Sequence, residues 1–291
     1  MRGLIKPFRV TSGRRFSLGA HDPGDTGDLK SKDEAADLLA RGLETLREQQ
    51  EKLYAQGTWA ILLIFQAMDA AGKDSIIKHV MSGVNPQGCQ VSSFKAPSAE
   101  ELAHDFLWRT TQRLPERGHI GVFNRSYYEE VLVVRVHPEI LGAQRLPPAM
   151  MTKRIWDERF EDIVCFERHL ARNGVAVMKF FLNVSKAEQK RRFLERLETP
   201  AKNWKFSAGD LRERDRWRDY MDKYEDMIRH TATTEAPWFV VPADHKWFTR
   251  LVVSAAIAER MKSLNLAFPA VDREKRKQLK TLEAGLRRKG A

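Results

Sequence analysis

The amino-acid sequence predicts an α/β protein in which a parallel sheet, flanked by helices, carries a phosphate-binding loop and a helical lid. Two observations predict this fold. From about residue 58 onward, short apolar runs alternate with segments of helical spacing, and such repetition produces a mostly parallel sheet with helices on both faces. The first apolar run also breaks into a small-residue turn at Gly72 and Lys73, directly before a helix.

The first half of the chain contains an N-terminal arm and the first three strands. Residues 1–30 are basic, then rich in Gly and Asp, and are expected to lie on a surface as an arm. Ser98, with Glu101 three residues later, forms a capping box that indicates a helix start. The expected elements are a helix over 33–54, a strand from about 58, a helix over 75–84, a strand over 89–94, a helix over 98–114 and a strand over 120–123.

The second half repeats the alternation of helix and strand. The expected elements are a helix over 150–173 that ends at Gly174, a strand over 175–184, a helix over 186–198 capped by Ser185, a charged segment over 203–230, a strand over 238–241 and a helix over about 245–264. The tail over 272–291 is dominated by Lys and Arg, which favours a solvated helix or a disordered segment.

Length and composition fit one large α/β domain with appendages. The chain has 291 residues, of which 42% are hydrophobic, and this is enough to fill a sizeable core. We therefore divide it into an N-terminal arm and helix (1–57), a P-loop core (58–264) whose lid spans about 199–230, and a basic C-terminal tail (265–291). Basic residues number 50 against 39 acidic ones, and the net charge of +11 favours a polyanionic partner: nucleic acid, an acidic membrane or polyphosphate.

Cysteine usage and hydropathy indicate a cytoplasmic protein. Cys89 and Cys165 show no metal-ligand spacing, and two cysteines are too few for a disulfide-stapled secreted fold. No segment approaches the roughly 20 consecutive apolar residues of a membrane-spanning helix, and the basic N-terminus lacks the apolar stretch of a signal peptide. We expect neither export nor membrane insertion.

The turn after the first core strand is the first candidate site. It reads Asp69, Ala70, Ala71, Gly72, Lys73, Asp74 and Ser75. A strand that feeds a tight turn at a helix N-terminus aims backbone N–H groups and the positive end of the helix dipole at one point, where Lys73 adds a full charge. The anion expected there is a phosphate. The loop is a variant of G-x-x-x-x-G-K-[ST], and taken alone it also fits an ordinary strand-to-helix turn.

The second candidate site follows the third core strand. The run Val122 to Glu130 ends in polar side chains at the carboxyl edge of the sheet, where ligands bind in parallel sheets. Phosphoryl transfer requires metal-binding carboxylates and cations that balance the charge of the moving group. Asp69 and Glu129 are the candidate metal ligands, and Lys73 and Arg125 the candidate cations, with Asn124 beside them. Without other motifs, Arg125 and Glu129 also fit a structural ion pair.

The third candidate site is a cationic segment between residues 185 and 217. Many of its basic residues lie around Trp204, and we single out Arg191, Lys202 and Lys205, together with Lys95 from an earlier loop, as phosphate-binding candidates. A cationic cover of this kind closes over phosphates and excludes water in nucleotide kinases. Most charge runs are solvated helix faces, however, and acidic residues at helical spacing are available as partners here.

Several motifs, taken together in this order, resemble those of polyphosphate kinase family 2. They are D-A-A-G-K-D-S from Asp69, V-M-S-G-V-N-P-Q-G from Val80, S-F-K-A-P from Ser93, F-N-R-S-Y-Y-E-E from Phe123, N-W-K-F-S-A-G-D-L from Asn203 and A-P-W-F-V-V-P-A-D-H-K-W-F from Ala236. The resemblance covers about residues 33–264. It implies a thymidylate-kinase-like P-loop fold, and members that move the terminal phosphate of inorganic polyphosphate to nucleotides, or the reverse, with Mg²⁺ (or Mn²⁺), often as dimers or tetramers.

The resemblance also implies roles for individual residues. Asp69 and Lys73 would hold metal and phosphate, and Arg125 would be the arginine that follows the Walker B strand. Asn124 stands where many members that act on diphosphates have Asp, and Glu129 where they have Asn. The pattern N-R-S-x-Y-E instead resembles the subgroup that phosphorylates both mono- and diphosphates, so AMP, ADP and ATP are the expected nucleotides.

Two other functions are compatible with the sequence. An ATP-dependent nucleotide kinase would share the loop, the lid and the sheet, and would differ only in its phosphate donor. A nucleic-acid-binding P-loop protein would explain the net charge, but the sequence contains no recognisable RNA- or DNA-binding module. We therefore expect no nucleic-acid partner.

Overall fold

A sheet of six strands lies at the centre of the computed structural model, which describes residues 2–205 and 207–289. The strands are β1 (Arg9–Val10), β2 (Ala60–Gln66), β3 (Cys89–Ser93), β4 (Ile120–Asn124), β5 (Val175–Asn183) and β6 (Trp238–Pro242). Their order across the sheet is β1-β6-β5-β2-β4-β3. The strand β1 runs antiparallel to β6, and all other neighbours are parallel. The predicted α/β fold with a mostly parallel sheet is confirmed.

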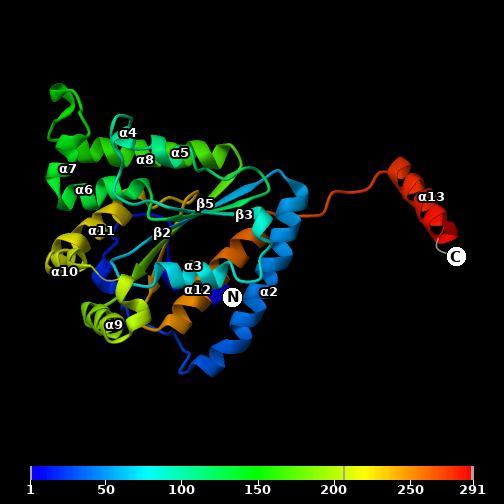
Figure 1. Cartoon of the computed structure of the whole chain (residues 1–291), viewed down its shortest axis with the longest axis horizontal. Helices are drawn as coiled ribbons and strands as arrows, with labels where there is room; N and C mark the ends of the chain where they lie inside the picture. Colours follow the sequence, from blue (N-terminus) through cyan, green and yellow to red (C-terminus); the bar gives the residue numbers. More distant parts are fainter. Residues whose placement is uncertain (1, 206, 290–291) are drawn as a thin grey trace.

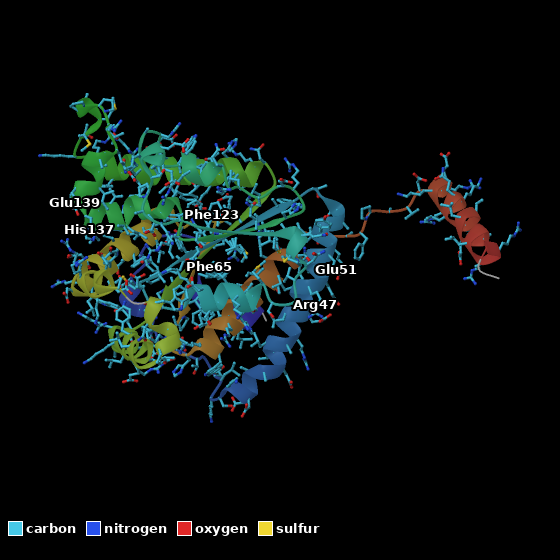
Figure 2. The ribbon with its side chains drawn as sticks, viewed as in Figure 1. Arg47, Glu51, Phe65, Phe123, His137 and Glu139 are labelled. Atoms are coloured by element: carbon cyan, nitrogen blue, oxygen red, sulfur yellow. The ribbon has the colours of Figure 1, made fainter. Side chains whose placement is uncertain are left out.

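The core is centred on β2 and β5. All seven residues of β2 are buried, and so is β5 apart from its first residue. Phe65 and Phe180 are partners in the β2–β5 register, and their rings stack with centroids 5.0 Å apart. Figure 2 shows Phe65 and Phe123 near the middle of the molecule. Strands covered on both faces have continuous apolar sequences, which is why these runs were recognisable in the chain.

Helices cover both faces of the sheet (Figure 1). The helices α2 (Lys32–Gln56), α3 (Lys73–Val80) and α12 (Lys246–Lys262) pack together on one face, while α8 (Ile155–Arg172) and α11 (Trp217–Thr231) pack together on the other. The remaining α-helices are α1 (Arg2–Ile5), α4 (Ala99–Leu102), α5 (Trp108–Thr111), α6 (Val133–Val136), α7 (Pro138–Ala143), α9 (Lys186–Glu198), α10 (Ala208–Asp215) and α13 (Arg273–Lys289). Short 3-10 turns are η1 (Lys6–Phe8), η2 (Leu18–Ala20), η3 (Pro86–Gly88), η4 (Tyr127–Val131), η5 (Pro148–Met150) and η6 (Pro200–Lys205). Within the described residues, no helix is both long and apolar enough to cross a membrane.

Helix ends agree with the sequence where a cap defines them. The helix over 186–198 has the predicted bounds, and the Ser185 hydroxyl accepts a hydrogen bond from the Glu188 N–H at 3.0 Å. The predicted capping box of Ser98 and Glu101 is also present. The continuous helix predicted over 98–114 is wrong, because the Asp105 carboxylate accepts from the Leu107 N–H at 2.9 Å and this local turn separates α4 from α5.

Two further predicted helices are shorter than expected. The helix predicted over 75–84 ends at Val80, ahead of Gly83, whose φ of 82° is left-handed and stops the helix. The helix predicted from Met150 begins at Ile155, because the segment before it forms the 3-10 turn η5, which starts at Pro148. The segment over 203–230, predicted only as a charged stretch, contains α10 and α11. Tyr220 on α11 is buried against the rest of the core.

The N-terminal arm is part of the core and does not merely lie on the surface as predicted. Ile5, Phe8 and Phe16 are each less than 8% exposed, and the rings of Phe8 and Phe248 meet edge to face 5.7 Å apart. At Gly13 the backbone approaches the Arg229 carbonyl so closely that a Cβ atom would lie 1.6 Å from its oxygen. Isolated apolar residues among basic ones gave no periodic signal for this packing.

A fully buried ion pair joins β5 to α8 behind the carboxyl end of β4. The Lys179 ammonium donates to Glu167 at 2.6 Å and to the Thr231 carbonyl at 2.8 Å. The hydroxyls of Tyr127 and Tyr128 donate to the other Glu167 oxygen at 2.8 and 2.7 Å. Burial lowers the pKa of Lys179, and Glu167 opposes this shift. Because each charge is paired and hydrogen-bonded, the network fixes η4 on the sheet.

Removing one charge of this pair is expected to be strongly destabilising. Lys179→Met leaves the Glu167 carboxylate buried and unpaired, and should lower the free energy of unfolding by about 3–5 kcal/mol in urea titrations. The double variant Lys179→Met/Glu167→Gln keeps an acceptor for the tyrosines but removes both charges, and should be more stable than the single variant. Equal stability of the single and double variants would contradict this account.

Candidate functional site

The loop between β2 and α3 is held in a conformation that presents backbone N–H groups. Ala70 and Gly72 both have left-handed φ angles, 62° and 109°. Gly72 adopts such an angle without strain, whereas Ala70 does so at some cost in free energy, as residues at functional sites often do. Gly72 is the N-cap of α3, so the N–H groups of the first helical turn have no carbonyl partner within the helix and point to the loop.

Two buried side chains of α9 hold the carbonyl side of this loop. Arg192, 4% exposed, donates to the carbonyls of Ala70 and Ala71 at 3.1 and 2.7 Å, and to that of Ala243, after β6, at 2.5 Å. Gln189 donates to the Asp69 carbonyl at 2.9 Å. Because the carbonyls are turned toward α9, the amide side of the loop is left to face an anion.

Lys73 lies in the loop with its ammonium group near the ends of β2 and α3. It donates to the carbonyls of Ala67 at 2.7 Å and of Met68 at 3.4 Å. Burial, reinforced by the nearby Arg125 charge, lowers the pKa of Lys73 from 10.5 to about 8. The carboxylates of Asp69, Glu129 and Asp74 oppose this shift only in part. A phosphate bound in the loop would oppose it further, because a nearby negative charge favours the charged form of the amine.

Arg125 joins the loop to the segment after β4. Its backbone φ of 63° is left-handed, and its N–H donates to the Phe65 carbonyl at 3.0 Å. The guanidinium lies 3.0 Å from the Asp69 carboxylate and 3.6 Å from that of Glu129, and Glu129 raises its pKa further above the ordinary value. One cation thus holds together the two carboxylates that were predicted as metal ligands.

Neighbouring amides fix the remaining polar groups of this junction. Gln66, fully buried at the end of β2, donates to Glu129 at 2.8 Å when its amide is oriented to satisfy both of its ends, and it accepts from Ser126 at 3.2 Å. Asn124 donates to the Asp74 carboxylate at 2.8 Å. Asp74 is therefore tied to β4. It stands where the standard motif has Ser or Thr, so this position carries a carboxylate acceptor and not a hydroxyl.

A cleft of about 640 Å³ opens above the loop. Its cations come from six segments of the chain and are Lys73, Lys95, Arg125, Arg192, Arg196, Lys202 and Lys246. The acidic residues in its wall are Asp69, Asp74, Glu195 and Asp210. Cations therefore outnumber carboxylates where α9, η6 and the loop meet, which suits a ligand with several negative charges.

Most of the predicted site residues line this cleft. They are Asp69, Ala70, Gly72, Lys73, Asp74, Ser75, Lys95, Asn124, Arg125 and Lys202. Ala71 does not line it, since its carbonyl faces Arg192, and Glu129 lines the adjoining cavity. Arg191 is 60% exposed and pairs with Glu188 at 2.6 Å, outside the cleft. The Lys205 side chain lies outside the described residues.

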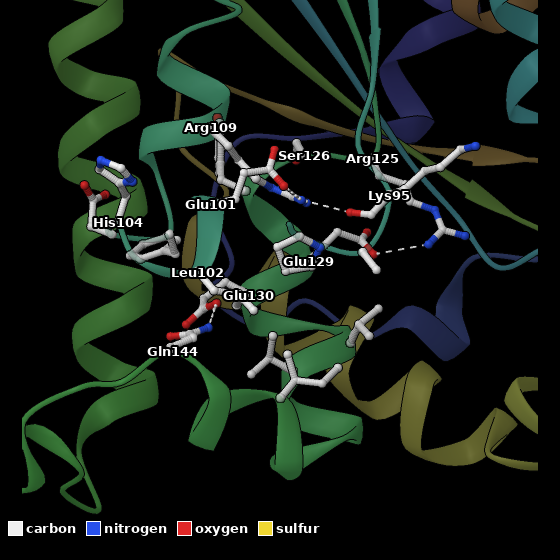
Figure 3. A pocket seen from close by; sticks show the side chains of 18 residues that line it. Lys95, Glu101, Leu102, His104, Arg109, Arg125, Ser126, Glu129, Glu130 and Gln144 are labelled. Atoms are coloured by element: carbon white, nitrogen blue, oxygen red, sulfur yellow. Dashed lines mark hydrogen bonds and ion pairs between the residues drawn. The ribbon is translucent and has the colours of Figure 1, made fainter. Parts of the chain in front are cut away.

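A second, smaller cavity of about 180 Å³ adjoins the cleft and shares Lys95, Ala96 and Arg125 with it. Figure 3 shows Lys95 and Arg125 at one end of this cavity, with His104 and Gln144 toward the other. Apolar side chains form much of its wall: Leu102, Phe106, Val133, Val134 and Ile140.

The far end of this cavity is fixed by the buried carboxylate of Glu130. Glu130 accepts from Gln144 at 2.6 Å and from Arg159 at 3.0 Å. Burial raises its pKa, and Arg159 opposes the shift. An apolar wall with a few fixed polar groups is typical of a site for a small organic ligand, in contrast to the cationic cleft beside it.

The sequence did not predict Gln189, the contact of Arg192 with the loop, or most of the lining of the small cavity, of which only Lys95, Arg125 and Glu129 were predicted site residues. Gln189 and Arg192 are three residues apart on α9 and share one face, so their spacing was a usable signal, but many cations nearby obscured it. The cavity is lined from the segments over 95–109, 125–134 and 140–144, and no spacing rule joins them. The first segment precedes β4 and the other two follow it, so only the folded structure brings them together.

The carboxylates are suited to a metal that arrives with its ligand. No group of three or more His, Cys, Asp or Glu side chains in the described part of the chain is arranged to hold a metal ion by itself. Mg²⁺ is commonly bound by one or two carboxylates, water and substrate phosphates. Asp69 and Glu129, on either side of Arg125, fit that requirement, since a phosphate chain in the cleft would supply the other oxygens.

The fold and the site together define a phosphotransferase with a P-loop kinase fold. Residues 29–269 match the family model described as Polyphosphate kinase 2 (PPK2), and the chain belongs to this family. The kinases of this family are generally metal-dependent.

Curated relatives and solved structures agree with this assignment. The chain is 54% identical over 280 residues to the ADP-polyphosphate phosphotransferase of Rhodopseudomonas palustris, with 96% of this chain and 97% of the relative covered. It is 44% identical over 269 residues to the AMP/ADP-polyphosphate phosphotransferase of Meiothermus ruber, covering 91% and 96%. The crystal structure of Polyphosphate Kinase 2 from Arthrobacter aurescens TC1 has a TM-score of 0.86 and 41% identity, with 96% of each chain covered.

The lowered pKa of Lys73 predicts a pH dependence. The amine is charged below its pKa of about 8 and neutral above it, so kcat/KM for the phosphate donor should fall as the pH rises through that value. Lys73→Arg keeps its charge at all these pH values, and any activity it retains should lack this inflection. The measurement is the pH profile of kcat/KM, and a wild-type profile that declines only near the ordinary lysine pKa would contradict the prediction.

The adjacent residues Arg191 and Arg192 provide a matched test of the loop support. Arg192→Gln removes the donors that hold the loop carbonyls and should lower kcat/KM about 100-fold through misplacement of the loop. Arg191→Gln removes only the ion pairs of an exposed side chain with Glu188 and Glu195, and should change kcat/KM less than about fivefold. Circular dichroism checks that both variants fold. Equal losses in the two variants would show that the cationic charge of α9, and not the hydrogen bonding, is what matters.

Proposed function

We propose that this protein transfers the terminal phosphate of inorganic polyphosphate to nucleoside mono- and diphosphates, converting AMP to ADP and ADP to ATP, and catalyses the reverse reaction. The observation that carries the proposal is the pair of adjoining cavities. One is a cationic cleft above the phosphate-binding loop, the other is partly apolar, and Arg125 and Lys95 line both.

The cleft is suited to the phosphate donor. A linear polyphosphate carries about one charge per phosphate, so several consecutive units require a row of cations. Lys73, Arg196 and Lys202 line the cleft. Together they supply more positive charge than a single terminal phosphate requires. The donor's terminal group would lie over the loop N–H groups, and its remaining units would extend between α9 and η6.

The smaller cavity is suited to the nucleotide acceptor. Its apolar wall fits a base and a sugar, while the end at Lys95 and Arg125 faces the cleft and fits the acceptor's phosphates. Use of both AMP and ADP follows from the resemblance to the mono- and diphosphate subgroup, and it agrees with the name of the Meiothermus ruber relative. Both reactions in one site require room for one extra phosphate at this end.

The proposed metal is Mg²⁺, with Mn²⁺ as the alternative, held by Asp69 and Glu129. When bound, it would neutralise charge on the donor's terminal phosphate. Arg125 positions both carboxylates, Lys73 balances charge on the transferring group, and the loop N–H groups bind its oxygens. The acceptor phosphate is already an anionic nucleophile, so transfer in line requires no protein base and no covalent intermediate.

Assembly and location remain expectations from the sequence. We propose a homo-oligomer, a dimer or a tetramer, that works in the cytoplasm without a nucleic-acid partner. Light scattering of the purified protein would measure the number of subunits.

A direct assay tests donor and acceptor together. Purified protein is mixed with Mg²⁺ and long-chain polyphosphate, AMP or ADP is added separately, and the nucleotides are followed by ion-exchange chromatography. The expected result is ADP and ATP from AMP, and ATP from ADP, without added ATP. Lys73→Ala should lower the rate roughly 100-fold or more, while Lys78→Ala, an exposed lysine of the same helix, should leave it unchanged.

Three outcomes would contradict parts of the proposal. Transfer only from ATP would identify a conventional nucleotide kinase. Transfer to ADP but not to AMP would limit the acceptors to diphosphates. Loss of activity in both lysine variants would show that net charge, and not the position of Lys73 in the loop, is required.

A further inference from the structure

The C-terminal helix α13 stands apart from the body of the protein (Figure 1). The family model ends at residue 269, and α13 begins at Arg273, so this helix lies outside the matched catalytic unit. The last buried side chain before it is Leu266. Residues 267–272 form no helix or strand and can span at most about 20 Å. Every side chain described between 273 and 288 is exposed.

The basic residues of α13 are segregated on one side. At 100° per residue, six of them fall within an arc of about 120°. They are Arg273, Arg276, Lys277, Lys280, Arg287 and Arg288. The leucines of the helix lie on the other side, and Leu282 and Leu286 are 62% and 73% exposed. The six cations form a row about 22 Å long, which we call the cationic face.

The cationic face is largely free to bind an external anion. Of its six members, Arg287 is the one with an ion pair to another described residue, Glu283, at 2.7 Å. Arg276 donates through Nε to the Val271 carbonyl at 3.0 Å, which leaves its two terminal nitrogens. The helix has two acidic side chains, Glu274 and Glu283, and neither lies inside the arc. Intramolecular pairing therefore accounts for little of this charge.

We propose that the cationic face of α13 is a second binding site for the polyphosphate chain, outside the active site. This inference rests on the proposed function, because the polyanion it assigns is the donor of that reaction. A linear anion with regularly spaced charges complements a straight row of cations, and binding releases counterions. A tethered helix that holds one part of a donor raises the effective concentration of the rest near the cleft.

Other occupants fit α13 less well. A helix that lies in a membrane surface buries a broad apolar face, commonly with Trp or Phe, whereas α13 has three leucines, no aromatic residue, and Lys275 on the leucine side. A stable contact with a second copy buries roughly 800 Å² per partner, and three leucines supply only a part of that.

The geometry predicts that chain length decides the effect. A short donor that fills the cleft cannot also reach α13, which projects beyond the α2 side of the sheet, away from α9 and α10 (Figure 1). The helix α13 should therefore strengthen the binding of long chains only, and it should leave the chemical step unchanged.

The test replaces the six cations of the cationic face with Gln in the full-length protein. A matched control replaces six exposed basic residues of the body with Gln: Lys30, Lys32, Arg41, Lys153, Arg168 and Arg172. Both variants have the same net charge. The first readout is the affinity for end-labelled long-chain polyphosphate by fluorescence anisotropy, without metal or nucleotide. The second is KM and kcat with long-chain and short-chain polyphosphate.

The expected result is roughly tenfold weaker binding and a higher KM for long chains in the α13 variant, with an unchanged kcat and a shallower salt dependence. Short-chain kinetics should match the wild type, and the body control should behave like the wild type throughout. Equal losses in the two variants, or unchanged long-chain binding in the α13 variant, would overturn the proposal.

Two further measurements distinguish the other occupants. In one outcome the wild type sediments with phosphatidylserine vesicles, the α13 variant does not, and the α13 variant still binds polyphosphate like the wild type. This result would assign α13 to a membrane surface and overturn the proposal. A drop in subunit number in Leu279→Ala/Leu282→Ala/Leu286→Ala, with the same loss of long-chain binding, would assign it to a subunit contact. If the wild type binds long chains but transfers phosphate from neither long-chain nor short-chain polyphosphate, the proposed function fails while the binding site stands.

Discussion

The hydrogen bonds of Arg192 are the constraint on which the rest of the site depends. A buried guanidinium must satisfy its donors, and this one does so with carbonyls of the phosphate-binding loop, carbonyls after β6 and the Glu188 carboxylate. These bonds connect α9, β6 and the loop. The loop can therefore keep Ala70 in a left-handed conformation and leave its N–H groups for an anion.

Electrostatics at Arg125 complement this arrangement. Asp69 and Glu129 lie on either side of its guanidinium, so two carboxylates are held close together without a metal. The same cation lies where the cleft and the small cavity meet. One residue after β4 thus holds a carboxylate in each cavity, Asp69 in the cleft and Glu129 in the smaller cavity. The strained backbone of Arg125, with its N–H bound to β2, fixes the direction from which the side chain enters.

The buried pair of Lys179 and Glu167 supports this junction from behind. Tyr127 and Tyr128 come directly after Ser126, and their hydroxyls bind Glu167. The turn that carries Glu129 and Glu130 is therefore anchored to α8 and β5 and does not depend on its own short 3-10 hydrogen bonds. Glu129 lies beside Arg125 and Glu130 lies at the far end of the small cavity, so one anchored turn positions both carboxylates.

The sequence by itself determined the sheet, the loop and the family, because strands buried on both faces, capping residues and a strand-turn-helix junction have local signatures. It also identified Asp69, Lys73 and Arg125, which lie together in the structure. Only the tertiary structure decided what surrounds them. It buried Phe8 and Phe16 of the arm, ended α4 at Leu102, turned Arg191 outward and Arg192 inward, and joined distant segments into the small cavity. These outcomes depend on contacts between residues far apart in the chain. The spacing of Gln189 and Arg192 places them on one face of α9, but it does not encode that this face meets a loop more than a hundred residues away.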